Sequence, residues 1–179
     1  MSEIISFPSE TGPCINTPAF LSERGFFLRP AQDADIPRLR VLYANTRAEE
    51  MAGVPWPLQL KQNFLDQQFD LQRRHYLEHY GDADFLVIEH DKVLLGRYYL
   101  LRTAPAHLII DICLMAGQCG QGVGRAIIEA SQREALAMQR GMHLHVLKVN
   151  NCAQALYVKL GFEFSGGTDT HHYMQWHGG

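Results

Sequence analysis

The sequence LIIDICLMAGQCGQGVGRAIIEA, residues Leu108–Ala130, decides the fold of this chain. It begins with the strand-forming apolar residues Leu108–Met115, passes through a turn rich in glycine, and continues as an apolar helical pattern. Glycine lets a backbone approach an anion closely, and the first turn of the following helix adds unpaired N–H groups and the positive end of the helix dipole. The segment therefore predicts a grip on a phosphate or pyrophosphate group.

The glycines of this turn argue against two common phosphate-binding loops. A nucleoside-triphosphate loop carries Lys and then Ser or Thr after its last glycine, but here Arg125 follows Gly124 and an alanine comes next. The dinucleotide fingerprint needs one more residue between its second and third glycines than Gly120, Gly122 and Gly124 provide. That fingerprint also belongs to the first strand–helix unit of its domain, whereas this turn lies two thirds of the way along the chain.

The segment Cys119–Gly124 resembles the loop of the GNAT superfamily of N-acetyltransferases. The family's loop reads Arg or Gln, two residues, Gly, one residue, and Gly or Ala, so this chain departs from it only at Cys119. A second segment, Asn150–Phe162, resembles the family's NxxAxxxYxxxGF pattern. More loosely, Phe26–Pro30 and the helical pattern after it resemble the family's opening strand and first helix. Two ordered motifs are far more specific than one glycine turn, which alone also suits a plain tight turn.

Periodicity and turn signals give the order of the secondary structure. Strands are expected at residues 25–30, 85–89, 93–101, 108–115 and 143–149 and twice more near the end, and helices at 33–46, 58–80, 122–140 and 151–160. This order predicts an α/β (α+β) fold in which helices flank a mixed, mostly antiparallel sheet. The strands on either side of the glycine-loop helix should be parallel because that helix forms a right-handed crossover. The GNAT resemblance implies in addition that this parallel pair splays apart at a cofactor cleft.

Length and composition narrow the class of protein. Residues 1–24 contain three prolines and are expected to form an N-terminal arm, and residues 25–179 a single GNAT-like acetyltransferase domain. A net charge of −3 argues against a nucleic-acid-binding surface. No segment approaches the ~20 apolar residues of a membrane span, and residues 1–20 do not resemble a signal peptide. Four scattered cysteines, Cys14, Cys113, Cys119 and Cys152, suit a reducing compartment, so we expect a cytoplasmic protein.

The resemblance implies acetyl-CoA as the co-substrate and no metal. The glycine loop would hold its pyrophosphate, and backbone groups of Leu114 and Met115 would pair with its pantetheine arm. Asn150 matches the family's cofactor-contacting asparagine, although an asparagine at this place also suits a helix N-cap, and both roles can hold together. The expected cofactor-binding residues are Leu114, Met115, Cys119, Gly120, Gln121, Gly122, Val123, Gly124, Arg125, Asn150 and Tyr157.

Three residues are candidates for proton transfer during acetylation of an amine. Tyr157 matches the family's general acid and would protonate the departing thiolate; the alternative is a tyrosine that packs its helix on the sheet. Asp111 is a candidate base because a carboxylate in an apolar strand needs an explanation, although it can also simply face solvent. His145, on the opposite strand, is a second candidate base, or a buried histidine satisfied by a backbone carbonyl. Glu49 and Glu50 could face the acceptor or form a solvated surface.

Other clusters leave a functional and a structural interpretation open. His75 and His79 have the spacing of metal ligands on a helix, but no third ligand is evident, so no metal is expected. An aromatic wall for the acceptor, or part of the core, could be formed by Trp56, Phe64, Tyr76 and Tyr80.

The sequence thus indicates an N-acetyltransferase that moves an acetyl group from acetyl-CoA to an amine by direct attack in a ternary complex. Two alternatives stay open: a non-catalytic module that senses CoA or acyl-CoA, and transfer of a longer acyl group. The acceptor is expected to be a small-molecule or peptide amine, and neither nucleic acid nor membrane is expected as a partner. A homodimer is compatible with an enzyme of this type. The identity of the amine does not follow from the sequence.

Overall fold

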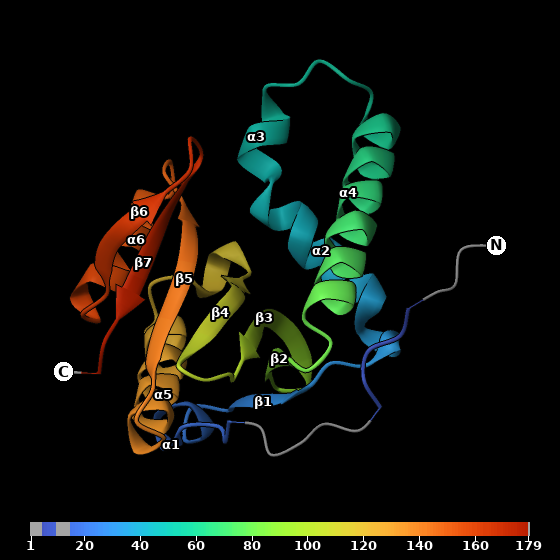
Figure 1. Ribbon diagram of the computed structural model, residues 1–179. Helices are drawn as coiled ribbons and strands as arrows, with labels where there is room; N and C mark the ends of the chain where they lie inside the picture. The colour runs from blue at the N-terminus through green and yellow to red at the C-terminus, as the bar shows by residue number, and fades with distance from the viewer. Residues whose placement is uncertain (1–4, 10–14, 179) are drawn as a thin grey trace.

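A seven-stranded sheet forms the centre of the structure, a computed structural model that describes residues 5–9 and 15–178 (Figure 1). Its strands are β1 (Phe26–Pro30), β2 (Asp84–His90), β3 (Val93–Leu101), β4 (Ala106–Leu114), β5 (Gly141–Leu147), β6 (Glu163–Gly167) and β7 (His171–Trp176). They are arranged in the order β1-β2-β3-β4-β5-β7-β6, and every neighbouring pair is antiparallel except β4 and β5. The predicted mixed sheet with one parallel pair is confirmed.

Helices cover both faces of this sheet. They are α1 (Ala19–Ser22), α2 (Ile36–Thr46), α3 (Ala48–Ala52), α4 (Leu58–His79), α5 (Val123–Ala137) and α6 (Asn151–Lys159), with short 3-10 turns η1 (Asp33–Asp35) and η2 (Ala116–Gln118). Residues of α1, α5 and α6 share one buried apolar cluster with the sheet, and residues of α2 and α4 share a second cluster on the opposite face. Two cores therefore sandwich the sheet, as the alternation of apolar residues along its strands requires.

Strand β5 illustrates how the sequence builds these two faces. Met142, Leu144 and Val146 are buried in the cluster beneath α5, whereas His143 and His145 between them turn to the opposite face. Polar residues therefore alternate with apolar ones along β5, and the polar side chains lie on the face of the strand away from α5.

Two short helices were not predicted from the sequence. Helix α1 follows Pro18 and is held by Leu21, which is completely buried, within the segment expected as an extended arm. Helix α3 contains no buried residue and precedes a connection that projects beyond the sheet together with the start of α4 (Figure 1). Helices this short bury too little surface to leave a periodic pattern. Cys14 and the rest of residues 10–14 lie outside the described residues.

The part of the sheet that shapes the site is the junction of β4 and β5. Their parallel ladder contains only four pairs, from Ala106 opposite Gly141 to Ile109 opposite Leu144. Immediately after the last pair, the register of β4 against β3 shifts at Ile110, which is an extra residue in β4. Beyond this β-bulge the two strands separate, as the predicted splayed pair requires. None of the helices among the described residues has the length and apolar character that crossing a membrane requires.

Candidate active site

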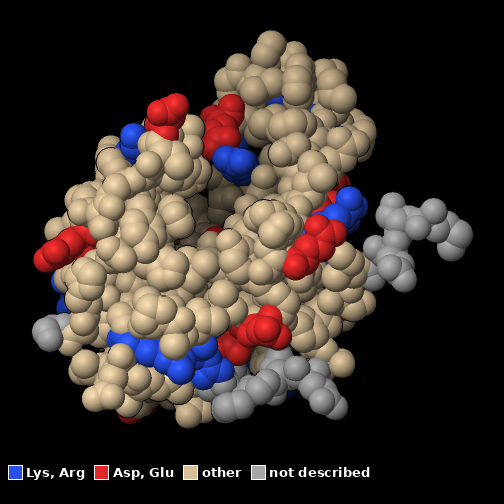
Figure 2. All heavy atoms as spheres, in the orientation of Figure 1, with Lys and Arg blue, Asp and Glu red and all other residues tan. Residues whose placement is uncertain are grey.

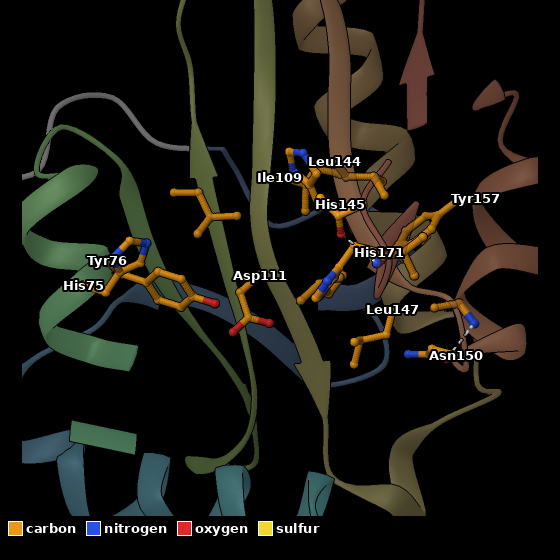
Figure 3. Close-up of a pocket in the computed structure, with 15 residues that line it drawn as sticks. His75, Tyr76, Ile109, Asp111, Leu144, His145, Leu147, Asn150, Tyr157 and His171 are labelled. Atoms are coloured by element: carbon orange, nitrogen blue, oxygen red, sulfur yellow. Dashed lines mark hydrogen bonds between the residues drawn. The ribbon is translucent and has the colours of Figure 1, made fainter. Parts of the chain in front are cut away.

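A cavity of about 540 Å³ opens where β4 and β5 separate. Residues 109–112 of β4 and 144–147 of β5 line it, and α4 and α6 contribute Tyr76 and Tyr157 from opposite faces of the sheet. Figure 2 shows the hollow near the centre of one face of the molecule. In Figure 3, Tyr76 and Asp111 lie on one side of the gap and Asn150 and Tyr157 on the other. The cavity therefore joins the two faces through the gap in the sheet.

The glycine loop lies at the N-terminus of α5, and none of its residues lines this cavity. Gly120 and Gly122 have φ angles of 79° and 81°, in the left-handed region that favours glycine. The first helical hydrogen bond runs from the Ala126 N–H to the Gly122 carbonyl. The backbone N–H groups of residues 123–125 therefore have no carbonyl acceptor within the helix. This arrangement of donors and helix dipole suits an anion.

Contacts from the N-terminal segment hold the loop in place. Arg24 donates a hydrogen bond from Nη1 to the Gln121 carbonyl at 2.9 Å, and its guanidinium lies 4.8 Å from the centre of the Phe20 ring. The same ring lies beside Gly122. Sequence reasoning did not find Arg24, because 97 residues separate it from its partner and no local pattern marks the contact.

The departure from the family pattern, Cys119, is an exposed free thiol. Its Sγ lies 3.8 Å from the Met115 carbonyl, and it is separated from the start of α5 by three residues. Arg125, at the other end of the loop, is exposed and pairs with Glu129 along the helix at 2.8 Å. Backbone groups, rather than these side chains, are therefore the donors that the loop presents.

The end of β4 offers one of the two backbone positions expected to contact the pantetheine arm. Met115 donates its N–H to Leu95 of β3 at 2.8 Å, and its carbonyl accepts from Gln118, so both groups are already engaged. Leu114 is the alternate residue of the antiparallel ladder, and its backbone groups turn away from β3 toward the gap. Leu114 therefore offers free backbone groups for the contact expected with the pantetheine arm, whereas the backbone groups of Met115 are already hydrogen-bonded.

Helix α6 brings Asn150 and Tyr157 to the cavity. The Asn150 side chain accepts a hydrogen bond from the Ala153 N–H at 3.1 Å, so the asparagine caps the helix. Tyr157 is buried, with its ring 5.9 Å from that of Phe162. Burial, and next the negative charge of Asp111, raise the pKa of the Tyr157 hydroxyl above its ordinary value. The phenol therefore keeps its proton at neutral pH.

Asp111 neither faces open solvent nor stands alone. Its Oδ2 accepts a hydrogen bond from Nη2 of Arg97, whose side chain is only 5% exposed. Arg97 also donates to Oε1 of Gln72 on α4 at 2.6 Å. The Tyr76 hydroxyl points toward Asp111 in Figure 3, and burial and then the Asp111 charge raise the pKa of that phenol. Sequence reasoning missed Arg97, although a charged residue inside the apolar run of β3 is a usable signal.

The second candidate base, His145, is exposed and lines the cavity, so the alternative of a buried histidine does not hold. Its ring lies 5.1 Å from that of Tyr173, the residue opposite it on β7. Burial, followed by the effect of His145, lowers the pKa of the neighbouring His143. Glu49 and Glu50 lie on α3, are exposed, and do not line the cavity.

The sequence of this site matches a known family model. The acetyltransferase (GNAT) domain matches residues 81–164, which include both the glycine loop and Asn150–Phe162. This match and the shared fold of solved GNAT acetyltransferases support membership of the chain in the GNAT superfamily. Among curated proteins, none matches the sequence.

Solved structures with the same fold include several acetyltransferases. The PaiA N-acetyltransferase from Thermoplasma acidophilum, in complex with coenzyme A, is 16% identical with a TM-score of 0.65, over 85% of this chain and 98% of that chain. The ribosomal-protein-S18-alanine N-acetyltransferase from Escherichia coli is 17% identical with a TM-score of 0.56, over 84% and 92%. YncA from Salmonella typhimurium, a putative acetyltransferase with its cofactor acetyl-CoA, is 18% identical with a TM-score of 0.54, over 87% and 95%. Likeness at these identities concerns the fold.

The GNAT fold of this chain brings together only part of the residues considered from the sequence. Asp111, His145, Asn150 and Tyr157 line one cavity, whereas the glycine loop lies apart from it at the start of α5. Of the four aromatic residues considered as an acceptor wall, only Tyr76 lines the cavity. His75 and His79 lie with their rings 4.2 Å apart on α4, and no group of three potential metal ligands occurs among the described residues.

Proposed function

We propose that this GNAT protein is an N-acetyltransferase that transfers an acetyl group from acetyl-CoA to an amine. The observation that carries the proposal is the cavity at the splayed β4–β5 pair, which has a protonated phenol, Tyr157, on one side and a carboxylate, Asp111, on the other. An acetyl transfer needs a proton donor and a proton acceptor on opposite sides of the reacting carbon. Two of the solved structures with this fold contain coenzyme A and acetyl-CoA, which supports this choice of co-substrate.

The residues present fit acetyl-CoA at three places. The N–H groups at the start of α5 and the left-handed glycines before it suit the pyrophosphate. The backbone of Leu114, on the part of β4 that has no partner toward β5, suits an extended amide-bearing arm. Asn150 lies at the cavity and would approach the same arm while capping α6.

The chemistry requires one bond to form and one to break. The neutral amine nitrogen forms a bond to the acetyl carbon, the thioester C–S bond breaks, the amine loses a proton and the thiolate gains one. Tyr157 is the proton donor for the thiolate, because its raised pKa keeps it protonated. Asp111 and His145, on the two separating strands, are the candidates at the cavity that can accept the amine proton, directly or through water.

Two measurements test this proposal. Acetyl-CoA should raise the melting temperature of the protein, because a ligand that binds only the native state stabilises it. A panel of amines assayed for release of free thiol should then show turnover with acetyl-CoA, and a comparison of acyl donors identifies the acyl group. No thermal shift at millimolar acetyl-CoA would refute the proposal, and binding without any turnover would favour the CoA-sensing alternative.

A further inference from the structure

We propose, on the basis of the proposed function, that the acceptor is a primary amine with no carboxylate beside its amino group. Free α-amino acids would then be poor acceptors, and amines such as their decarboxylated counterparts good ones. The proposal rests on the charges that an acceptor meets in the cavity between β4, β5 and α4.

The first observation is the set of ionisable side chains at the cavity. Among the described residues that line it, Asp111 is the one carboxylate, and none is a lysine or an arginine. The other ionisable groups are the imidazoles of His75, His145 and His171 and the phenols of Tyr76 and Tyr157. Apart from the three histidines, the lining of the cavity therefore carries one acidic side chain and no basic one.

The second observation is the orientation of the buried pair Arg97–Asp111. The Arg97 side chain is 5% exposed and does not line the cavity, whereas the Asp111 side chain is 17% exposed and does. Gln72 and Asp111 engage the guanidinium from within the protein. The pair as a whole is neutral, but it is a dipole whose negative end meets the ligand.

A buried arginine needs a reason, because desolvation of a charge is costly unless its partners compensate. Arg97 lies in the middle of β3 beneath α4, and its Nε has no hydrogen-bond partner. Its hydrogen bond to Oδ2 fixes the Asp111 carboxylate at the cavity surface. Arg97 is therefore a positioning residue, and Asp111 is the group that contacts the acceptor.

The consequence for an acceptor follows from these charges. An ammonium group gains a charge-assisted hydrogen bond from Asp111 in surroundings that water screens poorly. An α-amino acid brings a carboxylate next to the same ammonium, and no lysine or arginine lines the cavity to pair with it. Two isolated like charges about 6 Å apart at an effective dielectric constant of about 20 would reduce affinity roughly a hundredfold, and the Arg97 guanidinium behind Asp111 cancels part of this repulsion. With partial screening by solvent, we expect discrimination of at least about tenfold.

Matched trios of acceptors test this inference. Each trio contains an amine, the parent amino acid and the methyl ester of that amino acid: tyramine with tyrosine, histamine with histidine, and isoamylamine with leucine. The ester matches the bulk of the amino acid but lacks its charge. We expect the amine and the ester of at least one trio to be acetylated with kcat/KM at least about tenfold above that of the amino acid. Equal use of the amino acid, or no acetylation in any trio, would overturn the inference.

Two variants connect the discrimination to the carboxylate. In Asp111→Asn the ratio between amine and amino acid should fall to within about threefold, even where turnover itself is lower. Asp70→Asn is the matched control, because it removes an ion-paired carboxylate from α4 that does not line the cavity, and its ratio should be unchanged. An unchanged ratio in Asp111→Asn would contradict the inference, and if that variant does not fold, the wild-type ratios alone decide. Acetyl-CoA binding by thermal shift separates this outcome from failure of the proposed function.

Discussion

Replacement of Gly120 by alanine tests whether the glycine loop binds the cofactor through its backbone. Gly120 has a φ angle of 79°, and no atom lies within 4 Å of the position that a Cβ would occupy. The added methyl group therefore meets nothing, and the whole effect comes from backbone strain. Gly117 is the matched control, because a Cβ there also meets no atom and its φ angle lies outside the left-handed region.

The size of the effect follows from the cost of a left-handed L-residue, about 1–2 kcal/mol. Nothing packs on Gly120, so the loop can relax in the free protein, and the ligand must restore the strained conformation when it binds. The affinity for CoA should therefore fall by a factor of about 5–30. Gly120→Asn should lose less affinity for CoA than Gly120→Ala, because asparagine adopts left-handed conformations more readily than alanine.

Isothermal titration calorimetry measures the affinity for CoA and, for comparison, the affinity for pantetheine, which lacks the pyrophosphate. We expect Gly120→Ala to weaken CoA binding but not pantetheine binding, and Gly117→Ala to leave both within about twofold, a change well below the cost of a left-handed alanine. If Gly120→Ala binds CoA as tightly as Gly117→Ala does, the loop does not hold the pyrophosphate in the conformation described.

Three further predictions follow. Tyr157→Phe should lower kcat by roughly 10²–10⁴-fold while acetyl-CoA still raises the melting temperature; unchanged turnover would exclude the phenol as the general acid. Arg24→Met removes the hydrogen bond to the Gln121 carbonyl and should weaken CoA binding more than pantetheine binding in the same calorimetry, with partial recovery in Arg24→Lys; equal losses for both ligands would point to a general fold defect. Burial lowers the pKa of His107, so stability is complete above its ordinary value of 6.5 and is lost as the pH falls below that value toward the native-state pKa. His107→Phe should make the melting temperature less dependent on pH between about 7 and 5, and parallel profiles for both proteins would contradict this.

The elements that carry local patterns were predictable from the sequence. Alternation and helical periodicity placed the long helix α4 and the strands of the β2–β3 hairpin close to their observed bounds. The parallel arrangement of β4 and β5 followed from the handedness of the connection through α5. The separation of the two strands was expected from the family resemblance alone. The extra residue at Ile110, after which the strands separate, could not be predicted because it lies in a continuous run of apolar residues.

The contacts that tune the site were not predictable, because they join segments far apart in the chain. Nothing near Asp111 in the sequence indicates Arg97. The β3–β4 register places Arg97 diagonally across from Asp111, opposite Cys113, and Gln72 of α4 accepts a hydrogen bond from it. The same holds for Arg24 and the glycine loop. Propensity and motifs describe neighbours in sequence, whereas these pairs depend on how elements pack.

The composition of the cavity favours direct transfer over a covalent intermediate. A stepwise route needs a nucleophile such as cysteine or serine at the reacting carbon. Neither residue lines the cavity in the part of the chain that the structure describes. The one hydroxyl of a β-hydroxy residue there belongs to Thr168, and its oxygen accepts hydrogen bonds from the backbone of a turn. The proton donor Tyr157 and the carboxylate Asp111 approach from opposite faces of one sheet, and they can act on one carbon only in the gap between β4 and β5. Under the proposed function, donor and acceptor would therefore occupy that gap together.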